Sequence, residues 1–163
     1  MPADVTLRWE TDADREFMTR LYASMRTEEL APVPWSEEIK QAFLQSQFEL
    51  QRDHYRKHYR HAEFLVIERA GQPIGRLYLH PGAHEIRIMD IALLPAYRGQ
   101  GIGTRLLDAL LAHAQARGAP VTLHVEPLNP AQRPYRRLGF RLLEDRGVYH
   151  FLEWRPDQLN TSS

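Results

Sequence analysis

The sequence contains no cysteine. This absence excludes disulfide bonds, thiolate metal sites and cysteine nucleophiles. The sequence also has no excess of charge of either sign, because 21 Lys and Arg balance 21 Asp and Glu. This balance argues against nucleic acid as the main partner. No apolar run approaches the roughly 20 residues that span a bilayer. The start, MPADVTLRWETDADREF, lacks the basic and apolar regions of a signal peptide. We therefore expect a cytoplasmic protein without a membrane partner.

A chain of 163 residues is long enough for one domain with a substantial core. We expect residues 1–156 to form this single domain. The polar end, residues 157–163, is expected to be a flexible tail.

Apolar periodicity predicts an α/β fold with a mixed sheet and helices on both faces. Strands are expected over residues 5–10, 63–69, 74–80, 85–93, 121–126, 140–144 and 148–154. Thr11 and Asp14 resemble a capping box that opens a first helix, which ends before Pro32. Ser36 is expected to cap a second helix that runs toward Tyr59. Further helices are expected from the glycines near residue 101 to Gly118, and from about residue 131. Four residues need only a turn-making role: Gly71, Pro73, Gly75 and Pro81.

The most informative segment is residues 86–118, IRIMDIALLPAYRGQGIGTRLLDALLAHAQARG. An apolar run breaks at Pro95, and Gly99, Gly101 and Gly103 precede an amphipathic helix. Glycines in such a turn allow positive φ and let the backbone approach a ligand closely. The free N–H groups that open the helix favour an anion. The segment therefore predicts a site for a phosphorylated cofactor.

Two familiar phosphate-binding loops fit this segment poorly. A P-loop needs a lysine and then Ser or Thr after its last glycine, but Gly103 is followed by Thr104 and Arg105. The dinucleotide fingerprint G-x-G-x-x-G opens a βαβ unit near the start of a domain, whereas these glycines lie in the second half of the chain.

The spacing Arg98-x-x-Gly101-x-Gly103, after a strand ending Leu93-Leu94-Pro95, instead resembles the acetyl-CoA signature of the GNAT superfamily of N-acetyltransferases. Residues 121–140, VTLHVEPLNPAQRPYRRLGF, are similar to the second half of that family's motif. They supply a strand, a loop with Asn and Ala, and a Tyr-x-x-x-Gly-Phe ending. Pro134 departs from the family, which usually has leucine there, but the first turn of a helix tolerates proline.

The resemblance implies the GNAT fold, a mostly antiparallel sheet of 6–7 strands whose central parallel strands splay apart, with acetyl-CoA as cosubstrate and no metal. The end of the strand before the glycine turn would hold the pantetheine arm, and the turn would hold the pyrophosphate. The cofactor-binding residues implied in this way are Ile91, Ala92, Leu93, Arg98, Gly99, Gln100, Gly101, Ile102, Gly103, Thr104, Asn129, Ala131 and Tyr135.

Amine acetylation needs a group that removes a proton. An alkyl ammonium has a pKa of about 10, so exposing its lone pair at pH 7 costs roughly 4 kcal/mol. A general base helps to remove this proton, and a positioned donor helps the sulfur to leave. Tyr135 matches the tyrosine that often serves as the acid in the family; its alternative role is to pack the short helix on the sheet.

The candidate base is His124, which shares one strand face with Thr122 and Glu126. It stands where family members that acetylate protein amino termini often carry a glutamate, although a lone histidine in a strand is commonly structural. Asp90 lies inside an apolar run and is interpreted as a structural hydrogen-bond acceptor. Three further carboxylates are interpreted as a solvated face, with attraction of a cationic substrate as their alternative role: Glu28, Glu29 and Glu126.

Residues 52–61, RDHYRKHYRH, place His54 and His58 four apart on a helix. That spacing occurs in metal sites, and basic residues mixed with tyrosines occur in nucleic-acid sites. Tyr55 stands where a His-Glu-x-x-His motif needs Glu. We interpret the segment as a solvated helix side and expect no metal.

These observations predict an acetyl-CoA-dependent N-acetyltransferase that works by direct transfer through a ternary complex. The acceptor is expected to be a primary amine of a small molecule or a peptide terminus, selected by residues 22–51, including Trp35. The competing hypothesis is a non-catalytic acyl-CoA-binding regulatory module, which would need the glycine turn but not Tyr135 or His124. The family resemblance is compatible with a monomer or a homodimer.

Overall fold

A computed structural model describes residues 4–127 and 132–156. Asn129 and Ala131, two of the predicted cofactor residues, lie outside the described residues, as does the segment 157–163. The elements along the chain are β1 (Val5–Trp9), η1 (Asp12–Asp14), α1 (Arg15–Leu30), α2 (Glu37–His58), β2 (Glu63–Arg69), β3 (Gln72–Pro81), β4 (Ile86–Leu93), η2 (Pro95–Tyr97), α3 (Ile102–Arg117), β5 (Val121–Val125), α4 (Gln132–Arg137), β6 (Arg141–Asp145) and β7 (His150–Trp154).

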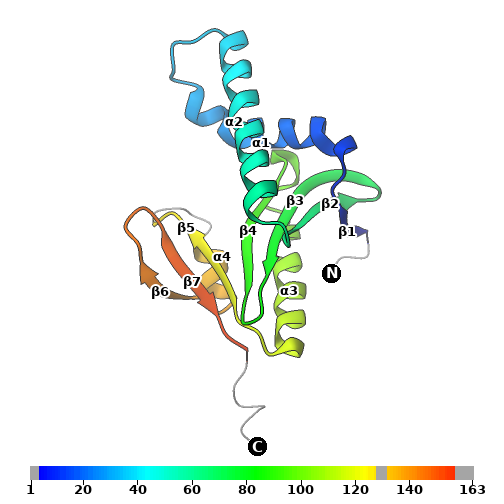
Figure 1. Ribbon diagram of the computed structural model, residues 1–163, viewed down its shortest axis with the longest axis vertical. Coiled ribbons are helices and arrows are strands. Elements are labelled where there is room, and N and C mark those ends of the chain that lie inside the picture. Colours follow the sequence, from blue (N-terminus) through cyan, green and yellow to red (C-terminus); the bar gives the residue numbers. More distant parts are fainter. Residues whose placement is uncertain (1–3, 128–131, 157–163) are drawn as a thin grey trace, which may run out of the picture.

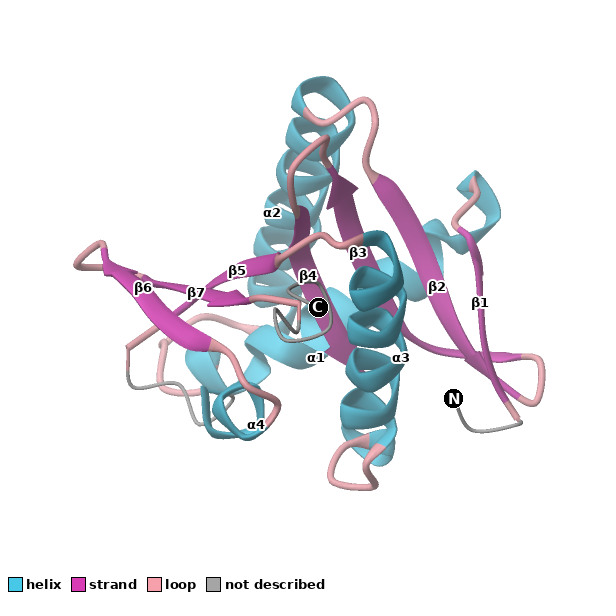
Figure 2. Cartoon of the chain, turned by 90° about the horizontal axis from the view of Figure 1, so that it is seen from below, coloured by secondary structure: helices cyan, strands magenta, loops and turns pink. Residues whose placement is uncertain are grey.

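The strands form one seven-stranded sheet in the order β1-β2-β3-β4-β5-β7-β6. Strands β4 and β5 pair in parallel, and the other neighbours pair antiparallel. Figures 1 and 2 show α1 and α2 on one face of the β1–β4 half and α3 on the other, while α4 lies beside β5 to β7. The expected mixed, mostly antiparallel sheet with helices on both faces is confirmed.

The sheet opens between β4 and β5. The two strands pair only at their first residues, Ile86 with Val121 and Arg87 with Thr122. A register shift on the other side of β4 leaves Met89 as an extra residue, because Tyr78 pairs with Asp90 and Leu79 with Ile88. Such a bulge bends the strand that carries it. The rest of β4 therefore runs free of β5, as the expected splay requires.

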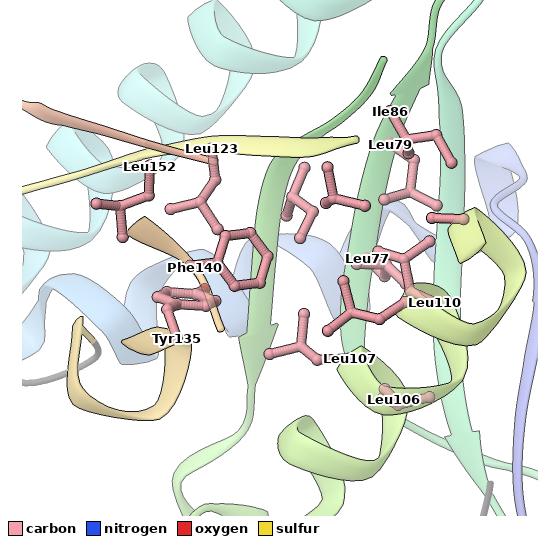
Figure 3. Packing of buried hydrophobic residues seen from close by; sticks show 14 of the residues in the cluster. Leu77, Leu79, Ile86, Leu106, Leu107, Leu110, Leu123, Tyr135, Phe140 and Leu152 are labelled. Atoms are coloured by element: carbon pink, nitrogen blue, oxygen red, sulfur yellow. The ribbon is translucent and has the colours of Figure 1, made fainter. Parts of the chain in front are cut away.

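A separate apolar cluster covers each face of the sheet. On one face, leucines of α3 pack against Leu77 and Leu79 of β3 (Figure 3). On the other face, Phe17 and Leu21 of α1 and Phe48 of α2 pack against Val66 of β2. Burial of each such side chain contributes about 1.5–3 kcal/mol. These clusters fix β4 and the start of α3 relative to each other.

The helix ends follow the local signals in the sequence. Thr11 and Asp14 form the expected capping box, and the Ser36 hydroxyl accepts a hydrogen bond from the Ile39 N–H. Helix α3 begins after Gly101 and ends at Gly118, both with left-handed backbone. Pro134 lies in the first turn of α4, where proline is tolerated.

Gly75 is not the turn residue that the sequence predicted. It lies inside β3 opposite Leu93 of β4. A Cβ atom at this position would stand 2.2 Å from the Ala92 carbonyl oxygen. The glycine is therefore needed because two backbones approach closely at the end of β4, and the prediction was wrong because only the tertiary structure brings Ala92 there.

Candidate functional site

A cleft of about 1040 Å³ opens where β4 ends and α3 begins. Its walls come from β4, the glycine turn, the first turns of α3, the end of α1, and α4. The lining residues are Met25, Glu29, Ile91, Ala92, Leu93, Tyr97, Arg98, Gly99, Gly101, Ile102, Gly103, Thr104, Leu107, Glu126, Pro134 and Tyr135. Of the predicted cofactor residues that the structure describes, all but Gln100 line this cleft.

The glycine turn presents backbone amides to the cleft. Gly99 and Gly101 have φ of 74° and 80°, a backbone region that favours glycine. The N–H of Arg105 donates to the Gly101 carbonyl, so the N–H groups of Ile102, Gly103 and Thr104 have no partner within the helix. These amides and the positive end of the helix dipole make the turn suitable for an anion.

Two side chains of the turn point to protein partners. Arg98 Nε donates to the Leu93 carbonyl oxygen at 2.9 Å. Gln100 Nε2 donates to the Ala96 carbonyl oxygen at 2.8 Å, and Gln100 Oε1 accepts from Arg69 at 3.2 Å. Their side chains thus brace the turn and join it to the end of β4 and to β2.

A smaller cleft of about 230 Å³ lies between the splayed strands. It is lined by Ile88, Met89, Asp90, Ile91, Leu123, His124, Val125, Glu126, Tyr135 and Tyr149. Three residues line both clefts: Ile91, Glu126 and Tyr135. The two clefts therefore meet at these residues, one on each side of the splay and one on α4.

Tyr135 is 9% exposed, and its ring packs edge-on against Phe140, with 5.5 Å between ring centroids. Burial, with a smaller contribution from the Asp90 carboxylate, raises the pKa of Tyr135 to about 12. The phenol therefore keeps its proton at neutral pH. Tyr135 thus has a packed ring, as its packing role requires, and a position in the cleft, as a role as the acid requires.

His124 of β5 lines the smaller cleft. Its ring stacks near Phe151, and its Nε2 lies 2.7 Å from Arg146 Nη1. Because a guanidinium has no acceptor, Arg146 donates and Nε2 accepts. Burial, and then the charges of Arg87 and Arg146, lower the pKa of His124. The imidazole is accordingly neutral at pH 7, with its proton on Nδ1.

A sequence model described as the acetyltransferase (GNAT) family matches residues 18–140. The chain belongs to this family. Mycothiol acetyltransferase of Corynebacterium glutamicum is 34% identical over 94 residues, which are 56% of this chain and 32% of that protein. The match thus spans about a third of the length of that relative.

Solved structures share the fold of this GNAT chain. The PaiA N-acetyltransferase from Thermoplasma acidophilum, solved in complex with coenzyme A, superposes with a TM-score of 0.69 and 20% identity, over 93% of this chain and 98% of that one. The ribosomal-protein-S18-alanine N-acetyltransferase from Escherichia coli gives a TM-score of 0.61 and 17% identity, over 93% of each chain.

The sequence did not reveal the main buried charge of this GNAT chain. Arg76 of β3 is 1% exposed, and it donates through Nε to Asp90 and through Nη2 to Gln51 of α2. Asp90 therefore acts as the structural hydrogen-bond acceptor that its apolar surroundings predicted. Nothing local marked Arg76 as its partner, because β3 and β4 become neighbours only in the sheet.

No residue of the basic and aromatic segment, residues 52–61, lines either cleft. His54 and His58 stack with 4.6 Å between ring centroids, and Tyr55 contacts Tyr78 and Phe64. Over residues 4–127 and 132–156, no three His, Asp or Glu side chains gather as metal ligands would. Over the same residues, no helix combines the length and the apolar character that crossing a bilayer requires.

Proposed function

We propose that the chain is an N-acetyltransferase that moves an acetyl group from acetyl-CoA to a primary amine of a small molecule or a peptide terminus. The observation that carries the proposal is the shared position of Tyr135. It lies where the large cleft, with the glycine turn, meets the smaller cleft between β4 and β5. A donor and an acceptor entering from opposite sides would meet there for direct transfer.

In this proposal the large cleft takes the cofactor. The free amides of Ile102, Gly103 and Thr104 would bind the pyrophosphate. Beyond Arg87, β4 has no strand partner on the β5 side among the described residues. Backbone groups from Ile91 to Leu93 would therefore bind the pantetheine arm as a strand edge binds a peptide. Acetyl-CoA supplies the activated acetyl group, as a thioester.

The smaller cleft would take the amine. Asp90 and Glu126 line it, and the carboxylate of Glu126, which has no ion-pair partner among the described residues, would attract a cationic ammonium group. Tyr135, protonated at neutral pH, would donate a hydrogen bond to the departing sulfur. His124, on the facing strand, is the candidate base carried over from the sequence. One relative is named for mycothiol and another for a ribosomal-protein alanine, so the proposal keeps both small-molecule and peptide acceptors.

The first test is calorimetric titration of the purified protein with acetyl-CoA. Saturable binding near one site per chain is expected, followed by acetylation of at least one member of an amine panel, detected by mass spectrometry. Absence of binding by folded protein would contradict the proposal. Binding without transfer to any amine would instead favour the non-catalytic acyl-CoA-binding module.

A further inference from the structure

We propose that Glu126, rather than His124, takes the proton from the acceptor amine. This inference rests on the proposed function. It follows from the position of Glu126, which lines both clefts, and from the contacts that occupy the other candidate groups. Sequence reasoning interpreted Glu126 as part of a solvated face.

A hydrogen bond to its main chain holds Glu126 in position. It follows the last residue of β5, and its main-chain carbonyl oxygen accepts a hydrogen bond from Gln132 Nε2 at 2.8 Å. Gln132 is buried in the first turn of α4, the helix that also carries Tyr135. The same amide group ties β5 to α4, so Glu126 and Tyr135 stay together at the junction with Ile91.

Within residues 4–127 and 132–156, the Glu126 carboxylate accepts no hydrogen bond and forms no ion pair, and it is exposed. The other carboxylate of the smaller cleft, Asp90, is held by the buried Arg76 guanidinium. Glu126 therefore supplies the carboxylate at the junction that has no partner to give up among the described residues when an ammonium group binds.

His124 has no lone pair open to the cleft. Its Nε2 accepts from Arg146, and the remaining nitrogen carries the proton of the neutral ring. Arg146 is itself anchored, since it bonds to Glu144 at 3.2 Å and stacks 4.3 Å from the Phe151 ring centroid. His124 would need to break this contact before it took a proton. The geometry assigns it to the wall of the cleft.

When the acceptor arrives as an ammonium ion, Glu126 takes one N–H proton, and the freed lone pair forms the C–N bond to the thioester carbonyl carbon. The C–S bond breaks and its electron pair leaves on sulfur. The sulfur gains a proton from Tyr135, which regains one from the new amide nitrogen. One proton is finally released to solvent from Glu126.

The test compares two acceptors with the full-length protein and acetyl-CoA. One is an alkylamine that wild-type protein acetylates; the other is hydroxylamine, which is weakly basic and carries a free lone pair at neutral pH. A base matters only for the alkylamine. The Glu126→Gln variant should lose about 100-fold or more in kcat/KM with the alkylamine and remain close to wild type with hydroxylamine.

The ratio of kcat/KM for the alkylamine to kcat/KM for hydroxylamine distinguishes a general base from a residue that only lines the cleft. His124→Asn should change kcat/KM by a similar factor for both acceptors. Asp108→Asn, which removes an exposed carboxylate on α3, should leave both values of kcat/KM unchanged. Because Glu126 is exposed, its variant should keep the wild-type thermal unfolding temperature. An unchanged ratio in Glu126→Gln with an altered ratio in His124→Asn would overturn this inference while leaving the proposed function intact. Wild-type protein that binds acetyl-CoA but acetylates no amine would overturn both.

Discussion

Tyr135 packs its ring in the core and lines both clefts, and its proposed role is to donate a proton to the leaving sulfur. The Tyr135→Phe variant keeps the ring against Phe140 and removes only the hydroxyl. We expect turnover to fall about 100-fold, because the proposed donor to the leaving sulfur is lost, while the affinity for acetyl-CoA stays near the wild-type value. Steady-state kinetics and calorimetry on the same preparation check both parts.

The high pKa of Tyr135 gives this test a second readout. The phenol loses its proton only near pH 12, so wild-type turnover should show no decline assigned to Tyr135 up to about pH 11. Turnover in the Phe variant that matches wild type with every acceptor would remove Tyr135 as the donor and leave it a packing residue.

Among the structural elements, the first turn of α3 allows a substitution whose effect on cofactor binding can be distinguished from its effect on stability. Gly103 lies inside α3, and a Cβ at this position meets no protein atom within 4 Å. A Gly103→Leu variant should be at least as stable as wild type, since leucine favours a helix by up to about 1 kcal/mol over glycine. Its side chain would occupy the proposed phosphate site, and we expect acetyl-CoA affinity to fall at least about tenfold.

Thermal unfolding and calorimetry measure these two effects, which have opposite signs. Ala112→Leu, on an exposed turn of the same helix, is the matched control and should leave affinity unchanged. Gly101 is less informative, because its φ of 80° would strain any other residue. Full affinity in Gly103→Leu would argue against the phosphate site in this turn.

The elements that the sequence predicted are those with local causes. Thr11, Ser36, Gly101 and Gly118 mark helix ends through hydrogen bonds and backbone angles that involve near neighbours in the chain. The family motif likewise lies in two continuous segments, which is why most of the cleft lining could be named in advance.

What the sequence could not supply depends on pairing across the sheet. Gly75 faces Ala92, Arg76 binds Asp90, and Arg146 reaches His124 from the hairpin between β6 and β7. Each partner is at least 14 residues away in the chain, so no periodicity or short motif predicts it. The proposal that Glu126, rather than His124, is the general base rests on contacts of this kind.

Among the residues that the structure describes, two residue pairs between β4 and β5 join the two halves of the sheet. One half, β1 to β4, carries α1, α2 and α3, and the other, β5 to β7, carries α4 (Figure 2). The shared core, which includes Leu107 of α3, Leu123 of β5 and Tyr135 of α4, crosses this junction. Burial of Tyr135 therefore contributes to holding the halves together as well as to the site.

This arrangement predicts a loss of stability in alkali. Burial raises the pKa values of Tyr55, Tyr78 and Tyr135, the last to about 12. The folded state therefore retains protons that the unfolded chain gives up above about pH 10, so the stabilisation is complete below pH 10 and is lost as the pH rises toward the folded pKa values. The sequence has only two lysines, Lys40 and Lys57, so tyrosines dominate the titration in this range.

For Tyr135 alone, a shift of this size corresponds to a loss of about 1 kcal/mol of unfolding free energy at pH 11. Urea unfolding at pH 9 and pH 11 should therefore show wild-type protein losing about 1 kcal/mol more than the Tyr135→Phe variant, which has no phenol to ionise there. Absorbance of tyrosinate would report the ionisation in the same samples. Equal losses in the two proteins would mean that Tyr135 ionises at the same pH in the folded and unfolded chains, so that its hydroxyl is not shielded from water in the core across β4, β5 and α4.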